Sequence, residues 1–382
     1  MANGDDGNVE RPREPSSQPT KDSLCFEIVT EVGRLFSLKP HWDNLCDRSI
    51  DHSFSQSFQW CSTAWKIIDL PQRRQLYCLV GWVDNRAVLI WPFVILRRGL
   101  WLMLQPLGWE TTEYSDVLVE NSPEADYWVA LAWRKLRATC KSDIVILPFV
   151  RTNSRLHRIV SKERPVSAWA NSISSVSWDG NQEWESYYQS LKRDFRYLLR
   201  SRRRRLSQRG YLSFEAVTEH EQLRPTIDWI FSHKTEWLIR TKRHSPWLES
   251  EPYKEFLIRV AAESEGTGSI MLFVLKFDGQ IISAVLGRIS KFSAEALIAA
   301  FDRSYGLYGP GHLLYEDILK WALERRLELD FRIGNETYKK DWTNRESEVI
   351  TYRFINSIWG AAFSLASRWR SELTSLRQKL LP

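Results

Sequence analysis

No stretch of this sequence approaches the roughly 18 uninterrupted apolar residues that a membrane-spanning helix needs. Residues 1–23 are rich in Asp, Glu, Pro, Ser and Gly and lack the apolar core of a signal peptide. We therefore expect a disordered tail and a cytoplasmic protein, with peripheral contact at the inner membrane left open. The remaining length suffices for two domains of about 100–200 residues each.

Cysteine is scarce: all five lie in the first half, and none shows CxxC or Cys/His metal spacing. Buried, reduced thiols are expected, without a disulfide framework or a bound metal. The Walker lysine pattern, the Rossmann GxGxxG pattern and the Gly-x-Ser-x-Gly elbow are absent as well. The sequence thus gives no sign of a P-loop nucleotidase, a dinucleotide oxidoreductase or a serine hydrolase.

Positive charge is concentrated in one segment. The net charge is +6, but residues 192–209 alone carry +8, so the remainder is slightly acidic. This segment belongs to a predicted amphipathic helix between Asp179, a candidate N-cap, and Gly210. Its apolar stripe comprises Trp184, Tyr188, Leu191, Phe195, Leu198 and Leu206, and its basic face Lys192, Arg193, Arg196, Arg200, Arg203 and Arg204. That face is either simply solvated or a patch for an anionic ligand, namely a cofactor phosphate, an anionic glycan or RNA.

An internal repeat relates the two halves of the chain. The hexapeptide Phe26–Glu31 resembles Phe214–Glu219, 188 residues later, and the hairpin turn at Asp84-Asn85 precedes one at Asp278-Gly279 by 194 residues. Periodicity predicts the same order, β-α-α-β-β-β-α-β, in each half. The fold class expected is therefore α/β (α+β), with two tandem units that each contain a mixed, mostly antiparallel sheet flanked by helices.

The most informative motif is a glycine-rich loop between a strand and a helix. It runs from Phe301-Asp302 through Gly309-Pro310-Gly311 to His312 and Leu313. Proline suits the first turn of a helix, and free N–H groups at a helix N-terminus can hold a pyrophosphate. The loop could equally be a structural turn.

The chain resembles GNAT-like acyltransferases of the cellulose-biosynthesis (CelD/BcsL-type) family, which are related to the Fem-type aminoacyltransferases. The resemblance covers about residues 26–355. The matching segments are Phe58-Gln59-Trp60, Gln105–Gly108 with Tyr114-Ser115-Asp116, Arg193–Gly210, Leu275–Gly279, Phe301–Gly311, and Asp330-Phe331 through Gly334, Glu336, Tyr338-Lys339 and Trp342. In the family, the last block usually begins Asp-Phe-Gly. Here Arg332 follows Asp330-Phe331 in place of that glycine, so the loop after Phe331 differs from the family pattern.

The resemblance implies a degenerate first unit at residues 24–165 and a GNAT acyltransferase unit at 166–356, followed by a C-terminal helix at 357–382. It implies acetyl-CoA or another acyl-CoA as the donor and no metal. The cofactor-binding residues it implies are Tyr308, Gly309, Gly311, His312 and Leu313. Lys339 is a further candidate, which could pair with a cofactor phosphate or an acceptor carboxylate, or could be a surface lysine.

Direct transfer in such enzymes requires a base, a donor to the thioester carbonyl and an acid for the thiolate. Tyr338 is the candidate acid, and Asp302, Asp330 and His312 are candidate bases. Each also has a structural alternative: a packed phenol, carboxylates that cap backbone amides, and packing at a helix start.

The expected activity is N- or O-acyl transfer to an amino sugar, a polysaccharide or a cell-envelope precursor. Two alternatives stay open: a Fem-like transferase that uses aminoacyl-tRNA, and a non-catalytic scaffold that binds the machinery of polysaccharide or cellulose synthesis. Contact with nucleic acid is expected only in the first alternative.

Overall fold

The computed structural model describes residues 24–50, 52–112, 114–217, 219–263, 269–334 and 336–362. The predicted tail (1–23) and most of the predicted C-terminal helix lie outside these residues, although 358–362 are helical. All five cysteines are free thiols; Cys61, Cys78 and Cys140 are buried as expected, but Cys25 is exposed and Cys46 is half-buried.

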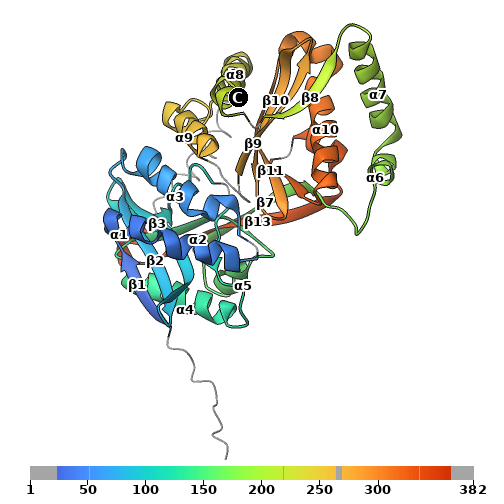
Figure 1. Cartoon of the computed structure of the whole chain (residues 1–382). Helices are drawn as coiled ribbons and strands as arrows, with labels where there is room; N and C mark the ends of the chain where they lie inside the picture. The colour runs from blue at the N-terminus through green and yellow to red at the C-terminus, as the bar shows by residue number, and fades with distance from the viewer. Residues whose placement is uncertain are drawn as a thin grey trace, which may run out of the picture.

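The repeated order of elements is confirmed, with a few short helices added (Figure 1). The first half consists of β1 (Cys25–Val29), α1 (Val32–Ser37), α2 (Lys39–Arg48), η1 (Phe54–Gln56), α3 (Phe58–Ala64), η2 (Trp65–Asp69), β2 (Gln75–Val83), β3 (Arg86–Arg98), β4 (Trp101–Pro106), β5 (Leu118–Val119), α4 (Ala125–Thr139), β6 (Ile144–Arg151) and α5 (Arg155–Val160). The second half has β7 (Ser167–Val176), α6 (Trp184–Ser190), α7 (Arg193–Ser207), β8 (Leu212–Val217), α8 (His220–Thr241), α9 (Glu251–Ala262), β9 (Ser269–Phe277), β10 (Gln280–Ile289), β11 (Ser293–Phe301), η3 (Arg303–Tyr308), α10 (Pro310–Glu324), β12 (Glu328–Ile333), α11 (Thr337–Trp342) and β13 (Arg345–Ile355).

One continuous mixed sheet runs through both halves, in the order β1-β2-β3-β4-β6-β13-β7-β12-β11-β10-β9-β8, with β5 on β3. The repeated hexapeptides thus form most of the two edge strands, β1 and β8. Both predicted hairpin turns have the positive φ angles that tight two-residue turns require, 49° and 60° at Asp84 and Asn85, and 47° and 79° at Asp278 and Gly279.

The two halves exchange their last strands at the centre of the sheet. Although it is grouped with the second half, β7 is the first unit's counterpart of β13, because each follows a strand and a short helix, β6 and α5 or β12 and α11; yet β7 pairs with β12. β13 follows the second half and pairs with β6 of the first, and β7 and β13 pair with each other. The sequence predicted only an irregular strand where β7 forms a full 10-residue strand. The exchange makes the centre of the molecule a joint product of both halves.

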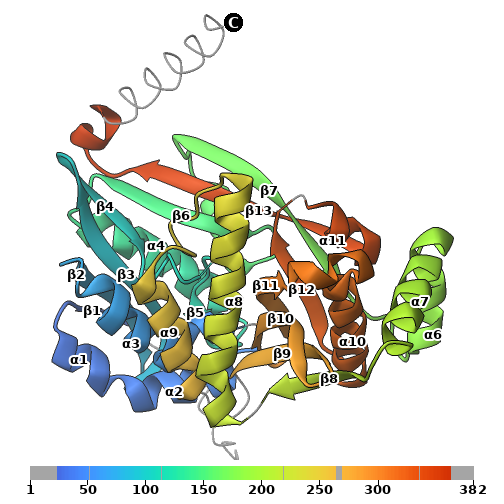
Figure 2. The same cartoon turned by 90° about the horizontal axis from the view of Figure 1, so that it is seen from above.

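Helices cover both faces of the sheet (Figure 2). Helices α1, α2, α3, α8 and α9 share one hydrophobic core that extends across both halves, with Trp60 of α3 against Phe256 of α9 at 4.9 Å between ring centroids. On the other face, α4 and α5 cover the first half, and α6, α7, α10 and α11 pack over the second. Many of the 19 tryptophans serve this packing, including the fully buried Trp42, Trp60, Trp91, Trp133 and Trp342.

The predicted single basic helix is wrong in two respects. The segment is broken at Leu191, which is extended, so that α6 and α7 are separate helices and α7 ends at Ser207, before Gly210. Leu199, not Leu198, completes the apolar stripe: Leu199 is fully buried, whereas Leu198 is 39% exposed. Because of the break, the buried face of α7 lies about one residue further along the chain than a continuous helix would place it. The spacing of the apolar residues did not indicate this shift.

Candidate active site

Strands β11 and β12 are parallel neighbours that separate towards their C-terminal ends. Only Ser293–Glu295 of β11 pair with β12, at Glu328–Asp330. On the other side of β11, the register with β10 shifts so that Leu297 has no partner residue there. Such a bulge re-aims backbone groups and is common next to active sites. The two strands therefore open a wedge in the middle of the second half.

A cavity of about 740 Å³, the splay cavity, lies at this wedge. Its walls come from β10, β11, α7, α8, α10, α11 and the loops between them. It is lined by Arg202, His233, Lys234, Glu236, Trp237, Arg240, Arg243, Ser283, Val285, Ala299, Ala300, Phe301, Arg303, Gly306, Gly309, Pro310, Gly311, His312, Tyr315, Glu336 and Tyr338.

The glycine-rich loop forms one end of the splay cavity. Gly309 takes the left-handed conformation, with a φ of 54°, and Pro310 opens α10 as predicted. Arg202 of α7 points at this turn: a Cβ atom added to Gly309 would collide with its guanidinium group. Nη1 of Arg202 is buried and has no hydrogen-bond partner in the described part of the chain. A helix N-terminus and an unpaired guanidinium N–H thus converge on one point, an arrangement that suits an anion.

Positive charge predominates around the splay cavity. Five cationic side chains line it against two carboxylates; the cations are Arg202, Lys234, Arg240, Arg243 and Arg303, and the acids are Glu236 and Glu336. Burial lowers the pKa of Lys234, and Glu336 opposes this only in part. Trp237 lies under two of the cations, Lys234 at 5.0 Å and Arg243 at 5.3 Å from its ring centroid. The cavity therefore offers several phosphate partners beside an aromatic surface.

Two of the predicted catalytic residues, His312 and Tyr338, line the splay cavity together. Their rings meet edge to face at 6.5 Å between centroids, and Tyr338 also stacks on Tyr315 at 5.7 Å. Burial lowers the pKa of His312, and the charge of Arg202 lowers it further. Burial raises the pKa of Tyr338, while its hydrogen bond with Tyr315 offsets part of that rise. At neutral pH the pair is a neutral imidazole and a protonated phenol, that is, a base and an acid.

Other predicted site residues lie outside the lining of the splay cavity. Asp302 caps η3, accepting hydrogen bonds from the backbone N–H and the hydroxyl of Ser304 at 2.8 and 2.7 Å. Nζ of Lys339 donates to the Ile333 carbonyl at 3.0 Å and pairs with Glu336 at 2.9 Å. Leu313 is fully buried in the core, and Tyr308 lies beneath the guanidinium groups of Arg205 and Arg209. The structural alternative thus describes the present contacts of Asp302, whereas Lys339 is not a surface lysine but is 4% exposed.

Asp330, the remaining candidate base, lies in a different place. It is 2% exposed and accepts hydrogen bonds from the Arg151 guanidinium at 2.6 Å and from the Tyr114 hydroxyl at 3.0 Å. Burial raises its pKa, and Arg151 counteracts part of that rise. Both partners come from the first half, so this carboxylate joins the halves and lines a second pocket between them.

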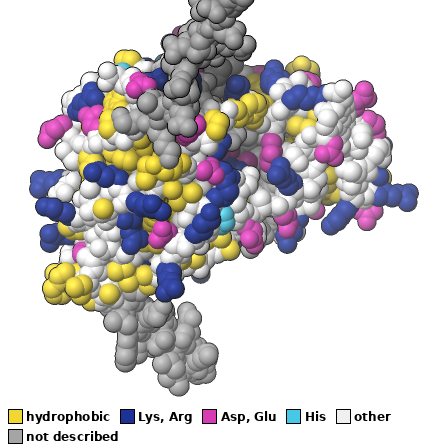
Figure 3. All heavy atoms as spheres, turned by 90° about the horizontal axis from the view of Figure 1, so that it is seen from below, with side chains coloured by type: hydrophobic (Ala, Val, Ile, Leu, Met, Phe, Trp, Pro, Cys, Tyr) yellow, Lys and Arg dark blue, Asp and Glu magenta, His cyan; other side chains and the backbone are white. Residues whose placement is uncertain are grey.

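The predicted anionic-ligand patch divides into unlike residues. Arg203 pairs with Glu316 at 2.8 Å and Asp317 at 3.0 Å, which ties α7 to α10. Lys192, Arg193, Arg200 and Arg204 are exposed, and Arg196 is half-buried; none of these lines the splay cavity. On the face drawn in Figure 3, basic and acidic side chains are interspersed. The cation that reaches the glycine loop is Arg202, which lies at the gap between Leu198 and Leu206 in the predicted apolar stripe.

Arg202 and Lys234 are among the site residues that the sequence patterns did not indicate, together with Trp237, Arg240, Arg243 and Arg303. The signal for Arg202 was its polar side chain on an otherwise apolar rung, and a phase break at Leu191 would have turned it towards α10. Lys234 lies in the middle of α8, far from any motif in the chain. Only the packing of α8 over β10 and β11 brings it to the cavity.

No group of three or more His, Cys, Asp or Glu side chains among the described residues could hold a metal ion. Within the same residues, no helix has the length and apolarity to cross a bilayer.

A family model described as the acetyltransferase (GNAT) domain matches residues 193–340. The matched segment lies within the second half of the chain and is similar to a GNAT acetyltransferase domain. The match contains α7, the glycine loop, Tyr338 and Lys339, so it includes both ends of the splay cavity. No curated protein is similar enough in sequence to be matched to the chain.

Solved structures with this fold span both halves. A structure of FemX has a TM-score of 0.58 at 11% identity and covers 85% of this chain and 96% of its own. A conserved protein from Bacteroides thetaiotaomicron has a TM-score of 0.52 at 12% identity, covering 82% and 96%. The C-terminal domain of a putative lysylphosphatidylglycerol synthetase from Agrobacterium fabrum has a TM-score of 0.52 at 12% identity, covering 87% and 95%. These likenesses concern the fold; the chemistry has to be argued from the site.

Proposed function

We propose that the protein transfers an acyl group from an acyl-CoA, such as acetyl-CoA, to an amine or hydroxyl of an amino sugar, a polysaccharide or another cell-envelope precursor. The observation that carries the proposal is the unpaired, buried Nη1 of Arg202 at the N-terminus of α10. A pyrophosphate there would receive hydrogen bonds from Arg202 and from the backbone N–H of Gly311, since the N–H groups of His312 and Leu313 donate to the Gly309 carbonyl.

The other cations of the splay cavity extend this donor site. Arg240, Arg243 and Arg303 would face the remaining phosphate charge of CoA, and Trp237 offers a ring for stacking. The pantetheine arm would then follow β11 into the wedge between β11 and β12. Backbone N–H groups near the bulge at Leu297 are the proposed donors to the thioester carbonyl.

Within this arrangement, His312 and Tyr338 have complementary roles. Neutral His312 takes the proton from the attacking amine or hydroxyl as the new bond to the acyl carbon forms. Tyr338 gives its proton to the sulfur of CoA as the thioester bond breaks. The first half contains no second Gly-Pro-Gly loop and contributes to the acceptor side.

The proposal is tested by calorimetric titration with CoA. Wild-type protein is expected to bind, and Arg202→Ala to bind about tenfold more weakly, since a charged hydrogen bond contributes about 1.5–3 kcal/mol. Arg204→Ala is the matched control, because it removes the same charge from an exposed position of the same helix. Absence of binding to the wild type, or an equal loss in both variants, contradicts the proposal. Binding without turnover on an amine and amino-sugar panel would favour a scaffold.

A second candidate is transfer of an aminoacyl group from aminoacyl-tRNA. The observation in its favour is the row of exposed cations on α7, Arg193, Arg200 and Arg204 among them. A tRNA bound there would lose affinity steeply with salt. Salt-sensitive tRNA binding that falls in an Arg200→Ala/Arg204→Ala double variant, together with no CoA binding, would replace the first proposal by this one.

A further inference from the structure

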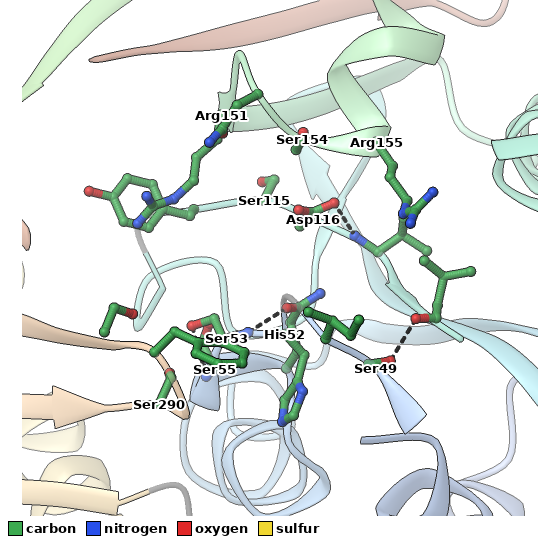
Figure 4. Close-up of a pocket in the computed structure, with 18 of the residues that line it drawn as sticks. Ser49, His52, Ser53, Ser55, Ser115, Asp116, Arg151, Ser154, Arg155 and Ser290 are labelled. Carbon is green, nitrogen blue, oxygen red and sulfur yellow. Dashed lines mark hydrogen bonds between the residues drawn. The ribbon is translucent and has the colours of Figure 1, made fainter. Parts of the chain in front are cut away.

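A second pocket of about 350 Å³, the serine pocket, lies between the two halves. One wall carries Arg151, Ser154 and Arg155 from the end of β6 and α5, and the opposite wall Ser53, Ser55 and Ser290, with Ser115 between them (Figure 4). Both halves are therefore needed to form it. Its volume lies at the small end of the roughly 300–1,000 Å³ of ordinary ligand sites, which favours a single compact unit over a long chain.

The charges around the serine pocket are largely compensated within the protein. Two ion pairs involve buried carboxylates of the pocket wall: Arg151–Asp330 at 2.6 Å and Arg288–Glu295. Arg155 and Arg158 each pair with Asp126 at 2.9 Å, and Arg345 pairs with Glu328 at 3.6 Å. Arg155 and Arg158 share one carboxylate, Asp126, and Asp116 also lines the pocket, so three arginines and four carboxylates line it. A ligand of either charge would therefore meet charges of its own sign beside those of the opposite sign. The pocket therefore favours a neutral ligand.

Hydroxyl and amide groups are the uncharged polar functions of the pocket wall, although Ser49 already donates to the Val119 carbonyl, and Ser154 and Ser290 accept from backbone N–H groups. The hydroxyl and amide groups belong to Ser49, Ser53, Ser55, Ser115, Ser154, Ser290, Ser293, Asn121 and Asn153. Ser115 is only 3% exposed, and its Oγ has no hydrogen-bond partner among the described residues. Burying a hydroxyl without a partner costs free energy, which a ligand that both donates and accepts hydrogen bonds would recover.

An aromatic ring completes the pocket. Phe292 lies in the turn between β10 and β11, lines the pocket and is 52% exposed. A large apolar ring at the mouth of a polar pocket suits a molecule that has an apolar face as well as hydroxyl groups. Sugar rings combine the two, since their axial C–H groups form an apolar face between equatorial hydroxyls.

We infer that the serine pocket binds a neutral sugar residue. It shares β11 with the splay cavity, but Glu295 lines the pocket and Ala299 the cavity, about 13 Å further along an extended strand. The sugar in the pocket is therefore a neighbour of the reacting unit within a longer acceptor. This last role rests on the proposed acyl transfer, whereas binding of the sugar does not.

Saturation-transfer NMR with glucose and N-acetylglucosamine, and with the anionic glucuronate as a charged counterpart, tests the inference on the full chain. The neutral sugars are expected to bind and glucuronate to bind at least fivefold more weakly. Ser115→Ala and Phe292→Ala should each weaken binding of the neutral sugars about five- to tenfold. Ser142→Ala is the matched control: Ser142 is also 3% exposed with an unpartnered Oγ, but it does not line the pocket.

Lack of binding by both neutral sugars overturns the inference, as does equal binding of glucuronate or unchanged binding by Ser115→Ala. Titration of the same preparations with CoA keeps the two proposals separate. CoA binding without sugar binding leaves the donor proposal intact and removes the sugar site. Sugar binding without CoA binding removes the donor proposal and leaves the sugar site intact. If Ser115→Ala is folded and binds CoA like the wild type, a general structural defect is excluded as the cause of its weaker sugar binding.

Discussion

At Gly309 the chain reverses from η3 into α10 with a φ of 54°, a conformation that side chains other than glycine adopt with strain. We expect Gly309→Ala to weaken CoA binding about tenfold, because the new methyl group also displaces Arg202. Gly180 has a φ of 49° and open space around it, so Gly180→Ala should cost the same strain, about 1 kcal/mol, and leave CoA affinity unchanged. Calorimetry and thermal unfolding of both variants check this; equal CoA affinity in the two would contradict it.

His312 should control the acid side of the pH profile. Its pKa lies below the usual 6.5, so the neutral form that accepts a proton persists below pH 6.5 and is lost only as pH falls through the lowered pKa. We expect kcat/KM to be level through neutral pH and to fall on the acid side of 6.5. His312→Gln should lower kcat by about 10²–10⁴ and abolish that fall, whereas Tyr338→Phe should keep it. A His312→Gln enzyme with the wild-type acid limb would exclude this base.

Arg332 illustrates what an altered motif means physically. By the resemblance described above it replaces the glycine of an Asp-Phe-Gly pattern, and it adopts a φ of 63° at a register shift between β12 and β7. The left-handed conformation explains a preference for glycine there. Here the arginine keeps that conformation while its backbone N–H donates to Asp330 at 2.6 Å and its Nη1 to the Leu297 carbonyl at 3.3 Å. The altered loop is thus accommodated next to the wedge.

At the scale of the element, Arg203 of α7 pairs with Glu316 and Asp317 of α10, in addition to the apolar packing between the two helices. Removing the guanidinium group in Arg203→Ala leaves Glu316 and Asp317, both largely buried, without that partner. We expect the free energy of unfolding to fall by about 2–3 kcal/mol, below the full cost of breaking a buried pair because Arg203 is partly exposed. Arg204→Ala should change it by less than about 0.5 kcal/mol.

The loss in Arg203→Ala should also depend on pH. Burial raises the pKa of Asp317 even with Arg203 beside it, and removing Arg203 raises it further. The carboxyl group then takes up a proton as pH falls, and the stability difference from wild type should shrink. Urea denaturation at several pH values measures this; a deficit that grows towards acid pH would show that the ion pair is not its cause.

At the scale of the whole molecule, the exchanged strands make each half incomplete alone. A fragment of residues 24–165 lacks β13, which pairs with β6, and exposes the core that α3 shares with α9. We expect the fragments 24–165 and 166–382 to be insoluble or unfolded when expressed separately and to form a complex when coexpressed. The full chain should unfold in one transition. Two separate thermal transitions, or a stable isolated fragment 24–165, would contradict this.

The sequence by itself determined the features that depend on near neighbours: the duplicated order of elements, the two hairpin turns, and the glycine loop that opens α10. Turn and cap preferences act within a few residues, so they are legible in the chain. Tertiary structure alone decided which arginine of α7 reaches the loop, that Lys234 borders the same cavity, and that Asp330 faces partners from the first half. The position of Arg202 depends on a one-residue change of helical phase, and that of Asp330 on strand pairing between residues nearly 200 apart in the chain. The energies of such contacts are set by packing and not by the local sequence pattern.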